Sequence, residues 1–165
     1  MTKPLMITFV CTGNTCRSPM AEVIARRLLE ERSDGTENHV AVGSAGVFAS
    51  RGSPASEGAR WAASEAGLDL DAHRSTQLTE EIVAESDLIL TMGRSHLSAV
   101  LDLGGSGKAH RLADFVGEAG DVGDPFGGPE DVYRSTFDEL ARLVGRLVTG
   151  MQDASDVAPT DASPS

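Results

Sequence analysis

The residues best suited to carry out a reaction are a cysteine and an arginine near the start of the chain, Cys11 and Arg17. The polar residues between and after them are Thr12, Gly13, Asn14, Thr15, Cys16 and Ser18. A loop that opens a helix can point successive backbone N–H groups at one anion, and the helix N-terminus favours negative charge. Arg17 can add a bidentate contact to two phosphate oxygens. The spacing therefore predicts a phosphate cradle formed by residues 11–18.

The same positive environment favours the thiolate form of Cys11 near neutral pH. A thiolate at the base of a phosphate cradle implies attack on phosphorus and a covalent phosphocysteine. Ser18 could hydrogen-bond that thiolate and ease its departure. Free cysteines are often simply buried, and a Cys and an Arg at this spacing also occur by chance. The strand expected before Cys11 and the helix expected after Arg17 favour the catalytic interpretation.

Such a reaction needs a proton donor for the leaving group. Asp124, followed by Pro125, lies in a long loop expected at residues 113–130, and long loops in compact domains are often functional. The competing aspartates are Asp102, Asp114 and Asp121. Most loop aspartates are merely solvated or capping, so position alone leaves the choice open.

Hydrophobic periodicity and turn residues predict the elements that position this loop. Strands are expected at 5–10, 40–45, 87–92 and 110–112. Helices are expected from Pro19 onward and at 54–66, 79–85, 95–103 and 130–148. This alternation predicts a three-layer α/β fold: a four-stranded parallel sheet flanked by helices, with the phosphate loop between the first strand and the first helix. We expect one domain over 1–149 and a disordered tail over 150–165, where large apolar residues almost disappear.

The formal net charge of −11 argues against nucleic acid and against an anionic membrane surface as partners. No apolar stretch approaches the length of a membrane helix, and the first residues make a poor signal peptide. We therefore expect a cytoplasmic protein, a monomer or weak dimer, that works without a metal or an organic cofactor.

Residues 10–22 resemble the active-site signature of the low-molecular-weight protein-tyrosine phosphatases. Similarity continues at Ser44-Ala45-Gly46 and at Asp124-Pro125, and it spans residues 5 to about 149. This resemblance implies a protein phosphatase acting on phosphorylated proteins.

The resemblance also implies roles for single residues. Cys11 is the expected nucleophile, Arg17 the phosphate clamp, and Asp124 the general acid that later activates water. Asn14 is expected to hold the loop in shape, with Ser44 and His73 as its supports. His73 read alone is an ordinary surface histidine. Cys16 matches the family's second cysteine, which can form a protective disulfide with Cys11.

Within the family the chain is most similar to the protein-arginine phosphatases. Thr15 stands where tyrosine phosphatases usually carry Ile, Val or Leu, and Phe126 follows Asp124-Pro125 where many carry Tyr. A threonine hydroxyl can interact with a guanidinium, and Phe126 could stack on it. We therefore expect phosphoarginine as the preferred substrate, with Thr15 and Phe126 setting specificity.

Three alternatives remain. A tyrosine phosphatase of the same family would use the same chemistry. An arsenate reductase is less favoured: no cysteine follows Cys16, so such an enzyme would need an external thiol. A purely phosphate-binding module would not need the thiol of Cys11.

Overall fold

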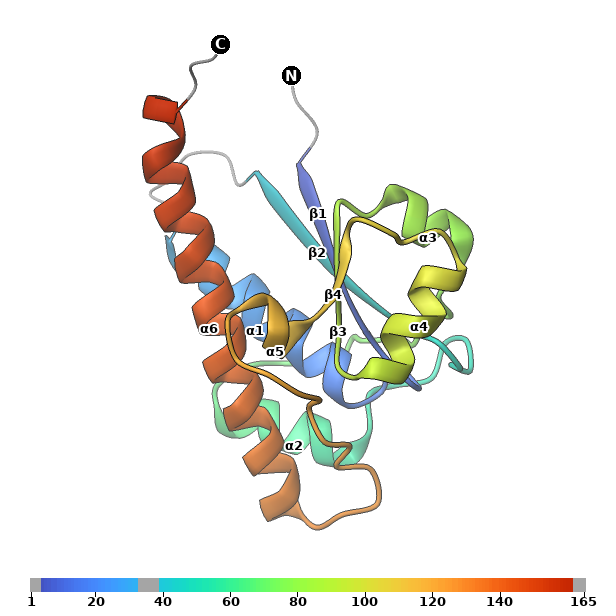
Figure 1. Cartoon of the computed structure of the whole chain (residues 1–165). Helices are drawn as coiled ribbons and strands as arrows, with labels where there is room; N and C mark the ends of the chain where they lie inside the picture. The colour runs from blue at the N-terminus through green and yellow to red at the C-terminus, as the bar shows by residue number, and fades with distance from the viewer. Residues whose placement is uncertain (1–3, 33–38, 162–165) are drawn as a thin grey trace.

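The computed structural model describes residues 4–32 and 39–161, with only the backbone described for 152–161. Its elements in chain order are β1 (Leu5–Cys11), α1 (Arg17–Arg32), β2 (Val40–Gly46), α2 (Glu57–Glu65), α3 (Glu80–Glu85), β3 (Leu88–Thr91), α4 (Arg94–Asp102), β4 (Ala109–Arg111), α5 (Leu112–Phe115) and α6 (Glu130–Asp161). The strands form one parallel sheet in the order β2-β1-β3-β4 (Figure 1). The expected four-stranded parallel α/β fold is confirmed.

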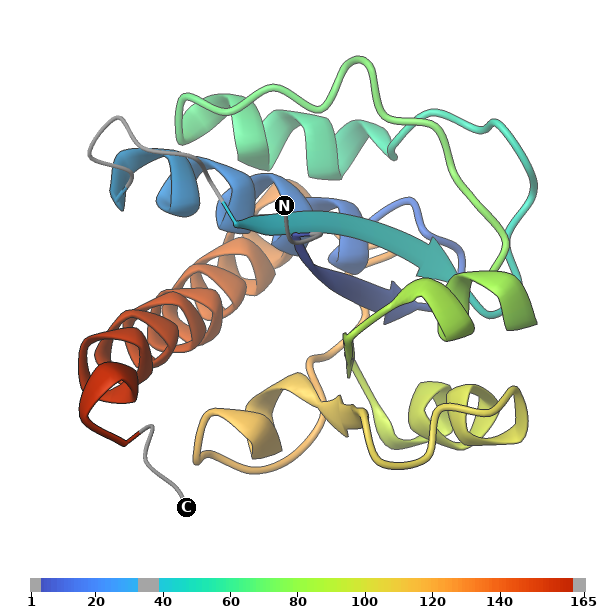
Figure 2. The same ribbon diagram turned by 90° about the horizontal axis from the view of Figure 1, so that it is seen from above.

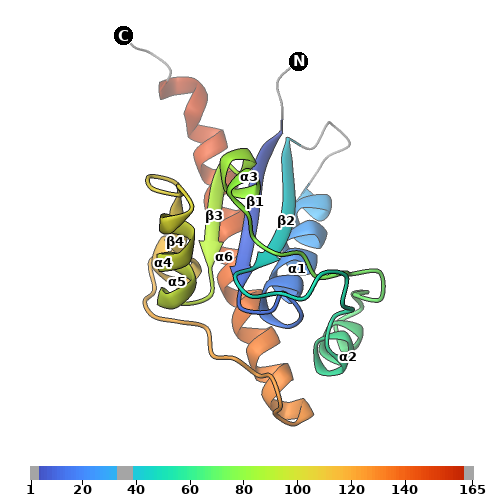
Figure 3. The ribbon, with the colours of Figure 1, turned by 90° about the vertical axis from the view of Figure 1, so that its right-hand side faces the viewer.

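Helices cover both faces of the sheet. Seen from above, α1, α5 and α6 lie on one face, and α3 and α4 lie on the other (Figure 2). Helix α2 packs against α6 and α1, outside the sheet. Viewed from the α3 and α4 side, β3, β1 and β2 run side by side and α6 passes behind them (Figure 3). The arrangement has the three layers expected from the alternation of strands and helices.

The alternation of side chains along β1 explains why both faces need a cover. Ile7 and Phe9 point into the larger core, which they share with α1 and α6. Val10 points the other way, into a smaller core with Val83 of α3 and Val100 of α4. Successive strand residues face opposite sides of a sheet, so a strand apolar at nearly every position must be buried on both.

The sheet topology brings the candidate loop to a position suited to ligands. Strand β1 lies beside β3; the connection that leaves β1 leads to β2 on one side, and the connection that leaves β3 leads to β4 on the other. Ligands of open parallel sheets bind at such a switch point. Cys11 is the last residue of β1, and α4 begins at Arg94, shortly after β3 ends.

Several boundaries differ from those expected. Helix α1 begins at Arg17 rather than at Pro19, so the guanidinium-bearing residue belongs to the first helical turn. Helix α2 begins at Glu57 because the Ser56 hydroxyl caps it by accepting a hydrogen bond from the Ala59 N–H. The loop expected from residue 113 contains the short helix α5.

Helix α6 extends past Gly150 to Asp161. The domain end at residue 149 and the disorder expected from residue 150 stay predictions. Within the described ranges, no helix combines the length and the apolar character needed to span a membrane.

Candidate active site

The loop between β1 and α1 turns tightly beside the end of β2. Asn14 adopts φ 58°, the left-handed conformation that asparagine tolerates better than most residues. Gly46 of β2 lies so close to this turn that a Cβ there would be 2.5 Å from the Thr12 carbonyl oxygen and 2.9 Å from the Asn14 nitrogen. A glycine at position 46 is therefore required for the loop to pack against the sheet.

Asn14 is the centre of a hydrogen-bond network that holds the loop in shape. Its Oδ1 accepts from the Thr76 N–H at 2.8 Å, which fixes the orientation of the amide. Its Nδ2 therefore donates to Ser18 Oγ at 2.8 Å and to Ser44 Oγ at 2.9 Å. The His73 Nε2 lies 2.8 Å from the Asn14 carbonyl oxygen. Both expected support residues thus contact Asn14.

Cys11 is buried, and its Sγ lies 2.9 Å from Ser18 Oγ. Ser18 Oγ accepts from Asn14, so its single hydroxyl hydrogen has two acceptors in reach: the sulfur at 2.9 Å and the Ala45 carbonyl oxygen at 3.5 Å. The sulfur is the nearer of the two. Asn14, Ser18 and Cys11 therefore form a chain of polar contacts at the base of the loop.

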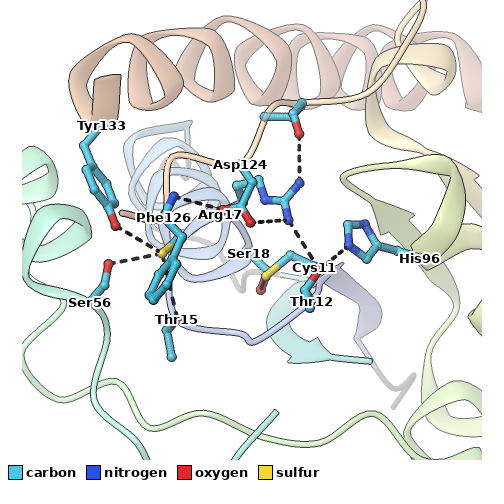
Figure 4. A network of polar contacts seen from close by, with 12 residues as sticks. Cys11, Thr12, Thr15, Arg17, Ser18, Ser56, His96, Asp124, Phe126 and Tyr133 are labelled. Carbon is cyan, nitrogen blue, oxygen red and sulfur yellow. Dashed lines mark hydrogen bonds and ion pairs between the residues drawn. The ribbon is translucent and has the colours of Figure 1, made fainter. Parts of the chain in front are cut away.

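Arg17 extends over the same region and is only 7% exposed (Figure 4). Its Nη1 donates to the Val122 carbonyl oxygen at 2.9 Å. Its Nη2 lies 3.5 Å from Thr12 Oγ1 and 3.6 Å from Asp124 Oδ2. Its Nε is buried and has no hydrogen-bond partner within the described parts of the chain. A buried guanidinium with an unused donor can accept an anion without first breaking a strong internal contact.

Of the four candidate aspartates, only Asp124 pairs with Arg17 in the part of the chain that the structure describes. Its side chain is 52% exposed, and its Oδ1 accepts from the Phe126 N–H at 3.1 Å. Asp114 and Asp121 both pair with Arg111 instead, at 2.9 and 2.8 Å. Asp102 ends α4, away from the helix end that faces the loop.

The two residues expected to set specificity lie at the mouth of the loop (Figure 4). Thr15 is half-buried, and among the described residues its Oγ1 makes only a long contact, 3.8 Å, to Cys16 Sγ. Phe126 is 73% exposed, and Figure 4 shows its ring between Thr15 and Asp124. A large apolar ring exposed to this extent beside polar groups is available to a ligand.

Cys16 is a free, buried thiol, and Cys11 is also unpaired. The Cys16 Sγ lies 3.2 Å from Ser56 Oγ and 3.6 Å from the Tyr133 hydroxyl. Burial raises the pKa of Tyr133, and its contact with Cys16 adds to that rise. These contacts join the loop to the start of α2 and to α6, a role that the sequence did not indicate.

His96 is the site residue that sequence reasoning missed. It lies in α4, is 3% exposed, and places Nε2 2.8 Å from Thr12 Oγ1. Burial, with Arg17 as the second cause, lowers the pKa of His96 to about 4, while Asp121 and Asp124 oppose that shift. Its position after the carboxyl end of a central strand was the available signal.

No cluster of three or more metal-ligating side chains occurs among the described residues. The chemical elements of the site are instead a thiol, a buried guanidinium with a free donor, and an exposed carboxylate, all at the carboxyl end of β1. This set can bind a tetrahedral oxyanion and exchange a proton with a group attached to it.

Comparison with known proteins extends this description. The sequence profile of the family described as low molecular weight phosphotyrosine protein phosphatase matches residues 6–156. The chain is 43% identical over 152 residues to a protein-arginine-phosphatase of Geobacillus stearothermophilus, covering 90% of this chain and 97% of that protein. It is 40% identical over 146 residues to the low molecular weight protein-tyrosine-phosphatase PtpB of Staphylococcus haemolyticus, covering 88% and 99%.

Solved structures agree with the fold. The YwlE arginine phosphatase, in a mutant form with a phosphorylated active-site serine, has a TM-score of 0.83 and 41% identity. The match covers 90% of this chain and 96% of that one.

Proposed function

We propose that this chain, which belongs to the low-molecular-weight phosphotyrosine protein phosphatase family, hydrolyses phosphoarginine in proteins through a phosphocysteine on Cys11. Family membership makes the protein a phosphoprotein phosphatase, a hydrolase. Relatives named for arginine and for tyrosine both occur at similar identity. The choice between the two substrates therefore depends on the residues of this chain.

One observation carries the catalytic proposal. Within the described parts of the chain, the buried Arg17 guanidinium leaves its Nε without a partner, near a sulfur that contacts the Ser18 hydroxyl and a carboxylate that solvent can reach. An unpaired buried donor is costly unless a ligand uses it. A phosphate group seated in the loop would satisfy that donor and bring phosphorus to Cys11.

The first step transfers the phosphoryl group to sulfur. The Cys11 thiolate forms an S–P bond as the P–N bond to the arginine side chain breaks. Asp124, protonated at this stage, donates its proton to the leaving nitrogen. Arg17 and the loop N–H groups stabilise the three equatorial oxygens, where most of the catalysis of phosphoryl transfer arises.

The second step returns the enzyme to its starting state. Asp124, now a carboxylate, accepts a proton from water as the water oxygen attacks phosphorus and the P–S bond breaks. Ser18 donates its hydroxyl hydrogen to the returning thiolate, which improves the leaving group. Asp124 must be protonated for the first step and ionised for the second, so the reaction has a bell-shaped pH profile.

Thr15 and Phe126 support phosphoarginine over phosphotyrosine. The Thr15 hydroxyl makes only the long contact to Cys16, so its lone pairs remain available to the N–H donors of a guanidinium. A phenyl ring has no such donors at this position. The exposed Phe126 ring can stack on a guanidinium, which is an attractive cation–π geometry. The arginine-phosphatase name of a 43% identical relative points the same way.

The test compares hydrolysis of phosphoarginine and phosphotyrosine in peptides of otherwise identical sequence. Cys11→Ser provides the blank. Thr15→Val removes the hydroxyl at nearly constant volume, and Thr15→Ser keeps the hydroxyl, so the pair separates polarity from size. We expect wild type and Thr15→Ser to prefer phosphoarginine, and the preference to fall about 10-fold in Thr15→Val.

A phosphotyrosine preference in the wild type would overturn the substrate but leave the Cys11 mechanism. If Thr15→Val and wild type preferred phosphoarginine over phosphotyrosine by the same factor, the Thr15 hydroxyl would not determine specificity. If neither peptide is hydrolysed above the Cys11→Ser blank, the catalytic proposal itself fails.

A further inference from the structure

His96 is a buried histidine whose side chain reaches the phosphate loop from a different layer of the fold. Helix α4 lies on the opposite face of the sheet from α1, yet His96 Nε2 lies 2.8 Å from Thr12 Oγ1. Figure 4 shows the imidazole on one side of Arg17 and Phe126 on the other. His96 therefore borders the site through Thr12, and no hydrogen bond joins it to Cys11 among the described residues.

The charges around His96 decide the direction of its hydrogen bond to Thr12. Arg17 faces it from α1, and Asp121 and Asp124 face it from the loop before α6. The Nδ1 is buried without a hydrogen-bond partner in the described ranges, and it shares its surroundings with the Asp121 carboxylate beside Gly93. A hydrogen on Nδ1 is attracted by that carboxylate, whereas a bare lone pair would be repelled. On this ground we assign the hydrogen of the neutral ring to Nδ1, so that Nε2 accepts from the Thr12 hydroxyl.

This direction has a consequence for Arg17. Because the Thr12 hydrogen is used by His96, both lone pairs of Thr12 Oγ1 remain for other donors. Arg17 Nη2 lies 3.5 Å from that oxygen, so Thr12 offers it an acceptor on the side opposite Asp124. Thr12 also anchors the neighbouring segment, because its carbonyl oxygen accepts from the Phe48 N–H at 2.9 Å.

We propose that His96 is a positioning residue that orients the Thr12 hydroxyl and thereby holds the phosphate loop and Arg17 ready for the phosphate group. The inference rests on the proposed function, since it assumes that the loop binds phosphate. His96 acts as a neutral hydrogen-bond acceptor, and it touches neither phosphorus nor the leaving group. Burial lowers its pKa to about 4, which keeps the imidazole neutral at neutral pH.

The alternative is that His96 is a buried core residue that only stabilises the fold. The two roles differ in what a substitution changes in the folded protein. A purely structural histidine affects the unfolding free energy but leaves the phosphate affinity of folded molecules unchanged. A positioning histidine affects phosphate affinity, and does so through Thr12.

The experiment measures the dissociation constant of inorganic phosphate by calorimetry, at a pH and temperature where each variant is folded. His96→Gln can place an amide oxygen near the Nε2 position, whereas His96→Asn reaches only the Nδ1 position. We expect His96→Asn to weaken phosphate binding about 10-fold and His96→Gln to stay within about 3-fold of wild type.

Thr12 provides an independent arm, because it is exposed and its substitution does not open the core. Thr12→Val should weaken phosphate about 10-fold, and Thr12→Ser should restore most of the affinity. The double variant Thr12→Val/His96→Asn should be no weaker than the worse single variant, because both remove one interaction.

Wild-type phosphate affinity in His96→Asn would overturn the proposal. The proposal would also be overturned if the fold-losses of phosphate affinity in the two single variants multiplied in the double variant, because that result would place the two residues in separate interactions. If the wild-type protein binds no phosphate, the proposed function fails and this inference fails with it. Phosphate binding by wild type with no change on substitution refutes only the role of His96.

Discussion

Replacing His96 should weaken the dependence of the unfolding free energy on pH in the acid range, and the size of the effect follows from the surroundings of the imidazole. The pKa of His96 is lowered from 6.5 to about 4, mainly by burial and secondly by Arg17, against the opposing pull of Asp121 and Asp124. Above pH 6.5 the imidazole is neutral in both the folded and the unfolded chain, so it contributes no pH dependence. Below pH 6.5 the unfolded chain binds a proton that the folded protein does not bind until about pH 4.

Folding stability linked to this histidine is therefore fully present above pH 6.5 and is lost as the pH falls toward 4. Between pH 7.5 and 4.5 the loss amounts to about 2–3 kcal/mol for the two pKa values above. His96→Gln has no imidazole to protonate. Its unfolding free energy should therefore fall by about 2–3 kcal/mol less than that of wild type over the same interval, whatever its absolute stability at neutral pH.

Urea unfolding at closely spaced pH values measures this difference, with the slope against urea checked for constancy. His110→Gln is the matched control, because His110 is exposed and packs only at a tilted angle against Phe115. This variant removes an exposed imidazole and leaves the buried one in place. Its unfolding free energy should therefore depend on pH as that of wild type does. Parallel curves for wild type and His96→Gln would refute the reasoning that burial keeps His96 neutral.

Two further predictions concern the acid and the loop. Asp124→Asn should slow the hydrolysis of a substrate with a poor leaving group by about 10²–10⁴-fold, because such a group needs a proton from a general acid. The hydrolysis of a nitrophenyl phosphate, which has a good leaving group, should slow far less. Equal losses in the steady-state rates for the two substrates would show that Asp124 is not the acid. Gly46→Ala should destabilise the protein by about 1–3 kcal/mol in urea unfolding, because its Cβ would meet backbone atoms of Thr12 and Asn14. An alanine variant with wild-type stability would show that the loop can move away from β2.

The parts of the fold that sequence could predict are those determined locally. Alternating apolar runs and helical stripes identified all four strands and the longer helices, because burial pattern and period coincide there. The start of α1 was misplaced because Pro19 is a strong signal for a first turn, whereas the helix already includes Arg17. The one-turn helix α5 was missed because four residues are too few for a periodic pattern.

After Gly150 the composition and the backbone geometry of the chain point in different directions. Small and polar residues cannot bury enough surface to order a segment alone, so disorder is expected there and stays a prediction. The backbone of α6 nevertheless continues to Asp161, directly from a helix whose preceding turns pack on α1. A helix that is already formed can add residues without paying again for nucleation.

The composition of the loop could be predicted from sequence, but the direction of its hydrogen bonds could not. Which way the Ser18 hydroxyl points depends on Asn14, and the Asn14 amide is oriented by the Thr76 N–H, sixty-two residues away. A family resemblance supplies the identity of such partners as expectations. The donor and acceptor roles follow only when the three-dimensional network is complete.

His96 shows which missing fact limits a sequence-only analysis. As the third residue of a helix that follows a central strand, it was placed at the carboxyl edge of the sheet by secondary structure alone. His96 faces Thr12 only because β3 lies beside β1. Four parallel strands can adopt several orders, and not all of them place these two strands side by side. With the order β2-β1-β3-β4, the first turn of α4 necessarily borders the loop after β1. Strand order, rather than a motif, thus determines which residue can complete the phosphate loop.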